Sequence, residues 1–213
     1  MKNASKILIG AAVILIFFLS ACATTKLTEV WKDKSYTGGS LKSVMVLGLT
    51  ENDKTRKMFE DAFSNQFKSR GVEAVASLDA ISEDMKLTLD NVKSHKEIIK
   101  SAAAKHGMET VLITHLAGID EKEVYYPGSH DPMSPGIADF GSFYADAFTA
   151  TYTPGRYATH KYVRLASSLY DVETEKLIWF AQSQHVDPKS VNEMIEALGK
   201  AVMKSLRSNN LIP

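Results

Sequence analysis

In the first half of the chain, continuous apolar runs alternate with helical repeats of apolar residues. The run over 43–49 is followed by polar residues, a pattern typical of a strand buried on both faces. Apolar residues then recur at helical spacing over 55–70, and Gly71 stands where a helix that ends in a left-handed residue needs glycine. We expect a second short strand over 72–76.

A second helix and a third strand are predicted next. Ser94 and Glu97 have the spacing of a capping box, in which each side chain accepts a hydrogen bond from the other residue's backbone. The helix that begins there should run to Gly107, and residues 110–116 form a third apolar run. Strand, helix, strand, helix, strand with connections of this length predicts parallel crossovers.

The pattern changes at Gly118, and we expect a long loop and hairpin insertion over 118–170. Proline and glycine interrupt its first part, as in a loop. Residues 140–152 and 157–170 are β-rich around a Pro-Gly turn signal, which predicts two antiparallel strands. A polar turn and a further strand over 177–185 complete a meander.

The last segment has the clearest helical pattern. Ser190 and Glu193 form another candidate capping box, and apolar residues on one face predict an amphipathic helix to about Ser208. The fold class is therefore α/β with an α+β tail. We expect a mixed sheet flanked by helices, in the order β-α-β-α-β, then a β-meander and a C-terminal amphipathic helix.

The amino terminus has the layout of an export signal. Lys2 and Lys6 precede an apolar run over 7–19, which is too short to span a bilayer comfortably. The sequence Leu19-Ser20-Ala21-Cys22 resembles the bacterial lipobox. That resemblance implies a lipoprotein signal peptide over 1–21, diacylglycerol on the Cys22 thiol, and an acyl chain such as palmitate on the new amino group.

The residues after the lipobox suggest a location and a tether. By resemblance to enterobacterial lipoproteins, the absence of aspartate at position 23 favours lipid anchoring in the outer membrane, facing the periplasm. The polar composition of 22–40 predicts a lipidated tether. We expect a single α/β domain over 41–213.

Composition excludes several classes of function. Cys22 is the only cysteine, so its acylation leaves no thiol for a disulfide, a nucleophile or a metal ligand. Without Lys2 and Lys6 the chain carries 25 − 2 = 23 basic and 25 acidic side chains. This balance gives no reason to expect nucleic acid as a partner.

Chemistry-bearing motifs are sparse. The chain has no Gly-x-Ser-x-Gly, no His-Glu-x-x-His and no phosphate-binding glycine loop, so we expect neither an enzyme nor a cofactor. One alternative stays open, a hydrolase or metal-binding protein that uses 118–170. In it His130 and Asp131 would converge with Asp139 and with His160 or His185.

Aromatic residues concentrate in the same insertion. Tyrosine and phenylalanine in a long loop favour an interface, although they could equally cover a sheet edge. The candidate interaction surface consists of Tyr125, Tyr126, His130, Asp131, Phe140, Phe143 and Tyr144.

Several segments look like a broad set of bacterial lipoproteins: 44–48, 56–63, Gly71-Val72, 111–113 and 169–179. The order of elements is similar to the amino-terminal domain of the Tol propeller protein and to curli-secretion lipoproteins. The resemblance implies a binding or assembly module in the cell envelope, with a protein partner and no catalytic residues. The alternative is a homo-oligomeric subunit of an outer-membrane export complex.

Overall fold

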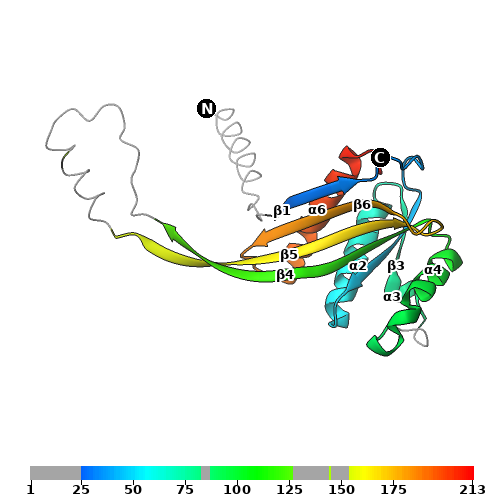
Figure 1. The fold of residues 1–213 in the computed structure, drawn as a ribbon, viewed down its shortest axis with the longest axis horizontal. Helices are drawn as coiled ribbons and strands as arrows, with labels where there is room; N and C mark the ends of the chain where they lie inside the picture. The colour runs from blue at the N-terminus through cyan, green and yellow to red at the C-terminus, as the bar shows by residue number, and fades with distance from the viewer. Residues whose placement is uncertain (1–24, 83–86, 127–143, 145–153) are drawn as a thin grey trace, which may run out of the picture.

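The protein folds into one six-stranded mixed sheet with helices on both faces (Figure 1). The computed structural model describes residues 25–82, 87–126, 144 and 154–213. The strand order across the sheet is β1-β6-β5-β4-β2-β3, which confirms the α/β class. The strands are β1 (Thr25–Lys32), β2 (Ser43–Leu49), β3 (Glu73–Ala76), β4 (Thr110–Tyr126), β5 (Arg156–Asp171) and β6 (Leu177–Val186); the helices are α2 (Asp53–Lys68), α3 (Ser77–Ala80), η2 (Leu89–Ser94), α4 (His95–Lys105) and α6 (Val191–Ser208).

The parallel half of the sheet follows the predicted crossovers. β2 pairs in parallel with β3 on one side and with β4 on the other. Gly71 ends the α2 turn with φ +76° and Gly107 ends α4 with φ +68°, a conformation that glycine adopts without strain. The three predicted strands and their parallel arrangement are confirmed.

The antiparallel half differs from the expected hairpin. β5 pairs with β4 from Tyr126↔Arg156 to Thr110↔Asp171, whereas the sequence predicts residues 140–152 as its partner. Those residues, apart from Tyr144, lie outside the described part of the chain. β4 passes through an irregularity at Ala117 and continues where a loop was expected, because a strand with solvent on both faces has no apolar alternation to reveal it.

The segment after the lipobox also differs from expectation. The sequence predicts a tether over 22–40, but residues 25–32 form β1, which pairs antiparallel with β6 at the edge of the sheet. Its sequence is mostly polar because one edge and one face of the strand meet solvent. Leu27 packs against the core. Cys22 therefore lies only three positions before the first strand in the sequence.

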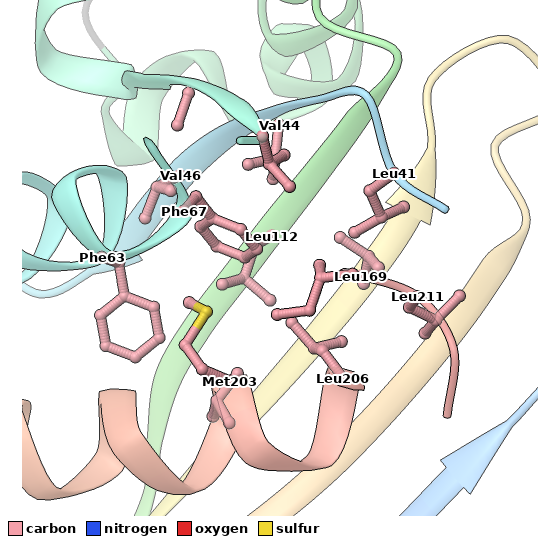
Figure 2. Packing of buried hydrophobic residues seen from close by; sticks show 14 of the residues in the cluster. Leu41, Val44, Val46, Phe63, Phe67, Leu112, Leu169, Met203, Leu206 and Leu211 are labelled. Carbon is pink, nitrogen blue, oxygen red and sulfur yellow. The ribbon is translucent and has the colours of Figure 1, made fainter. Parts of the chain in front are cut away.

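Two hydrophobic clusters hold the layers together, one on each face of the sheet. The larger cluster joins α2 and α6 to the sheet, and Figure 2 shows Phe63 and Phe67 of α2 approaching Leu112 of β4 and Met203 of α6. The smaller cluster packs α3 and α4 against the other face around Met45. No helix in the described ranges is long and apolar enough to cross a membrane.

The helix caps agree with the sequence at one position and not at another. Ser190 caps α6, accepting a hydrogen bond from the Glu193 backbone at 3.1 Å. Ser94 makes no side-chain cap bond, because η2 runs directly into α4 and its helical backbone leaves no extended N-cap. The capping box lies earlier, between Thr88 and Asn91.

Candidate functional site

Two neighbouring features mark the end of the sheet where β2 finishes. The first is a two-stranded ribbon, made of Glu121–Tyr126 of β4 and Arg156–Lys161 of β5. β2 pairs with β4 only as far as His115, and β6 pairs with β5 only from Tyr162 onward. The ribbon therefore extends beyond the sheet (Figure 1), and among the residues that the structure describes the outer edge of each of its strands has no paired strand.

The distal part of the ribbon carries exposed aromatic side chains. Tyr125 is 52% exposed and Tyr157 is 68% exposed, and their ring centroids lie 5.0 Å apart. Tyr126 lies on the opposite face, because successive residues of a strand alternate. Large aromatic rings left in water are typical of a binding surface.

Only part of the predicted interaction surface can be placed. The structure brings Tyr125 and Tyr126 together on the ribbon, and Tyr144 is 58% exposed. The other four predicted members lie outside the described residues; they are His130, Asp131, Phe140 and Phe143.

A chain of polar contacts, here called the ribbon clamp, ties the ribbon to the β6–α6 connection. The Tyr126 hydroxyl lies 2.8 Å from His160 Nε2, and His160 Nδ1 lies 2.5 Å from an Asp187 carboxylate oxygen. The Lys161 backbone N–H donates to the other Asp187 oxygen at 2.7 Å. The hydrogen bond from His160 is the main cause that lowers the pKa of Asp187.

The ribbon clamp joins the ribbon to the body of the fold through Tyr126, His160 and Asp187. The predicted grouping of His160 with His130 and Asp131 involves residues outside the described part of the chain. Within the described ranges, no group of three or more His, Cys, Asp or Glu side chains could hold a metal ion. The metal-binding alternative therefore gains no support from the described residues.

The second feature is an apolar groove of about 430 Å³ between the N-terminal ends of α2 and α6. Its floor is formed by β4 and β5, where the ribbon leaves the sheet. The lining residues are mostly apolar, and they are Gly48, Leu49, Thr50, Thr55, Phe59, Thr114, His115, Leu116, Ile119, Lys161, Val163, Leu165, Pro188, Ser190, Val191, Met194 and Ile195.

Several apolar side chains around the groove remain open to solvent. Leu49 and Leu116 are each 51% exposed, Ile119 is 50% exposed and Val191 is 43% exposed. Because these four side chains surround one groove, they form an apolar patch. Apolar residues exposed singly do not form such a patch. The sequence pattern assigns Val191 to the core face of its helix, but the helix begins too near the end of the sheet for Val191 to be covered.

A buried ionic network fixes the α2 wall of the groove. Glu60 is fully buried, and one of its oxygens accepts from the Gly48 backbone N–H at 3.0 Å, from Arg56 Nε at 2.9 Å and from the Ser77 hydroxyl at 2.7 Å. Its other oxygen accepts from the Leu78 backbone N–H at 2.8 Å. The network thus ties α2 to the ends of β2 and β3.

Gly48 lets the helix approach the sheet closely. A Cβ at this position would lie 2.9 Å from Cδ1 of Phe59, closer than real carbon contacts allow. Phe59 lines the groove, so the glycine and the aromatic ring together shape its inner wall.

His185 joins β1 to the sheet beside these features. The side chain is 2% exposed, its Nδ1 lies 2.8 Å from the Thr25 hydroxyl, and its Nε2 lies 3.1 Å from the Ser183 hydroxyl. Burial lowers the pKa of His185 from 6.5 to about 4. The imidazole is therefore neutral at physiological pH.

Comparison with known proteins shows similar folds at low similarity. No protein-family model and no curated protein sequence matches the chain. The PelC dodecamer from Paraburkholderia phytofirmans aligns at 10% identity and a TM-score of 0.42, over 84% of this chain and 94% of PelC. Lipoprotein GNA1162 from Neisseria meningitidis aligns at 11% identity and a TM-score of 0.42, over 78% and 98% of the two chains.

A third solved structure, hypothetical protein CT253 from Chlamydia trachomatis, aligns at 10% identity and a TM-score of 0.32, over 79% of this chain and 92% of that one. Fold likeness at this level does not determine function. The finer resemblance to the Tol propeller protein and the curli-secretion lipoproteins stays a prediction.

Proposed function

We propose that the protein is a lipid-anchored module of the cell envelope that binds a protein partner through the distal half of its ribbon. The observation that carries this proposal is the unpaired extension of β4 and β5 beyond the sheet. Two-stranded ribbons are marginally stable in water by themselves. Their free N–H and C=O groups form additional strand pairs readily.

The distribution of charge along the ribbon selects its distal half as the binding surface. Where β4 leaves the sheet, residues 120–123 are all charged. Charged side chains on the edge of a strand discourage pairing with other strands. The distal half, residues 124–126 and 156–158, contains no acidic side chain and has three tyrosines. A partner strand or an aromatic-lined surface fits this half better than the proximal half.

Site-specific photocrosslinking in intact cells tests the proposal. A photoreactive phenylalanine analogue replaces Tyr125 or Tyr157 in the full chain, and the matched control carries it at Val92, which is 57% exposed on η2. We expect discrete protein adducts from the two ribbon positions and none of the same mass from Val92. Equal capture from all three positions, or none from the ribbon, would contradict the proposal.

The mass of the adduct distinguishes two kinds of partner. An adduct at twice the mass of the chain identifies a second copy, which would favour the oligomeric export subunit. A different mass identifies another envelope protein. The mass of the peptide that begins at Cys22 reports in the same sample whether the lipid anchor is present.

A substitution tests whether the aromatic rings contribute to this binding. With the photoreactive residue at Ala158, we expect Tyr157→Thr to lower the adduct yield while preserving the strand, because threonine also favours β structure. Val30→Thr, at an exposed position on β1, is the control and should leave the yield unchanged.

A further inference from the structure

We infer that the apolar groove is a binding site for an acyl chain, and that its occupant is one of the acyl chains carried by Cys22 of the same molecule. The inference rests on the lipid anchor of the proposed function. It is independent of the ribbon and of any protein partner. Three observations carry it: the shortness of the free N-terminal segment, the register of the sheet, and the lining of the groove.

The free segment between lipid and fold is short. β1 begins at Thr25, so only residues 23 and 24 separate it from Cys22. Three residue steps of extended chain span at most about 11 Å. The sulfur-linked glyceride is therefore held within a short radius of the start of β1.

The register of the sheet places the groove within this radius. Thr25 lies opposite His185, His185 opposite Val163, and Val163 opposite Ile119. Neighbouring strands lie about 4.8 Å apart, which puts Val163 about 10 Å from Thr25 and Ile119 about 14 Å away. Both Val163 and Ile119 line the groove, and directly paired residues point to the same face of a sheet.

The lining of the groove suits a hydrocarbon chain. Its volume of about 430 Å³ is within the range of small-molecule sites, and four of its aliphatic side chains are 43–51% exposed. An acyl chain in the groove would cover Leu49, Leu116 and Val191, and would remove its own methylenes from water. Burying the groove side chains and the acyl chain together stabilises the bound state.

An intramolecular site has a functional consequence. A chain tethered this closely is at high effective concentration at its own groove, so the lipidated protein can hold one of its acyl chains out of water while that chain is not inserted in a membrane. Because the bilayer interior and the groove are both apolar, the chain can move from one to the other. The groove would thus cover the acyl chain while that chain is outside a membrane.

Crosslinking through the lipid itself tests the inference. Cells are fed a fatty acid that carries a diazirine in its chain, the full-length protein is purified, and the sample is irradiated before digestion and mass spectrometry. We expect a crosslink between the acylated Cys22 peptide and peptides from 49–59, 114–119 or 188–195. A phospholipid adduct on those peptides without the Cys22 crosslink would overturn the intramolecular assignment, and so would the absence of any adduct in the groove.

Groove variants make the test specific. Ile119→Glu places a carboxylate at a half-exposed position of the lining, and we expect it to reduce the Cys22 crosslink roughly tenfold or more, because a charge beside hydrocarbon is costly to desolvate. Val30→Glu introduces the same charge at a position 45% exposed on β1 and should leave the crosslink intact. Equal effects of the two substitutions would contradict the assignment.

A second groove variant separates loss of the binding site from misfolding of the first variant. Val191 is the first residue of α6, where glutamate is favourable to the helix, so Val191→Glu should fold normally and still lower the crosslink. An unlipidated Cys22 peptide would remove the basis of both proposals. A lipidated peptide without groove crosslinks would overturn only the acyl-chain site, and the ribbon crosslinks would be unaffected.

Discussion

His185 is a buried base at the joint between β1 and the rest of the sheet. Its pKa is about 4 in the fold against an ordinary value of 6.5, so the unfolded chain binds more protons between these two values. The free energy of unfolding therefore falls as the pH falls from about 6.5 to about 4, by about 3 kcal/mol from this residue. The loss should be complete below that range and absent above it.

We predict that His185→Gln removes this part of the pH dependence. Glutamine keeps hydrogen-bonding capacity toward Thr25 and Ser183, so the variant should lose only about 1 kcal/mol near neutral pH. Urea unfolding at several pH values measures both effects, and the other titrating groups cancel between the two proteins. An acid-side decline as steep in the variant as in the wild type would contradict the assignment to His185.

Glu60 is the acceptor of the network that positions α2. Glu60→Gln leaves the Arg56 guanidinium buried without its counter-charge, and loss of one partner of a buried ion pair costs about 3–5 kcal/mol. The matched control is Asp61→Asn on the same helix, which breaks the exposed pair with Lys57 and should cost about 1 kcal/mol or less. Denaturant midpoints compare the two, and similar costs would contradict the role given to Glu60.

The ribbon clamp should decide how firmly the ribbon is ordered. We predict that His160→Phe, which keeps a ring but removes the bonds to Tyr126 and Asp187, speeds hydrogen exchange of the ribbon amides and leaves β2 and β3 protected. Local opening of this kind follows from a ribbon with few other contacts. His106→Phe, in the loop after α4, is the control. Faster exchange across the whole sheet would instead indicate global destabilisation.

Elements with strong periodicity could be predicted from the sequence, whereas those set by their surroundings could not. The apolar run of β2 and the apolar stripe of α6 can be recognised in the sequence, because other elements of the fold cover both and their buried positions are apolar. The outer half of β4 has charged residues on both faces, and β1 is a polar edge strand, so neither carries an apolar alternation.

The candidate site shows the same division. Tyr125 and Tyr126 are recognisable from their local concentration of aromatics. The groove is not, because it depends on where the helices begin relative to the ends of the strands. The partnership of His160 with Asp187 also depends on the register between β5 and β6, which no local pattern encodes.

At the scale of the whole molecule, the start of β1 and the base of the ribbon lie at one end of the sheet (Figure 1). Residues that line the groove, such as Leu49 and Ile119, lie at the same end. The short segment between Cys22 and Thr25 should then turn this end toward the membrane that holds the lipid. The opposite end, where β2 begins, should point away from it. The seven residues of β2 separate the two ends by about 23 Å.

Energy transfer from a dye to acceptor-labelled lipid headgroups measures this orientation. Cys22 is the only cysteine, and under the proposed function its thiol carries the lipid. A single cysteine introduced at Glu51 or at Lys42, on either side of β2, is then the one thiol that reacts with the dye. We expect stronger transfer from position 51 than from position 42 in vesicles. A flexible Gly/Ser insertion between residues 24 and 25 should reduce the difference, because a longer linker frees the body to turn. Equal transfer without the insertion would mean that the short segment does not orient the fold, and the groove would then have no preferred access to the membrane.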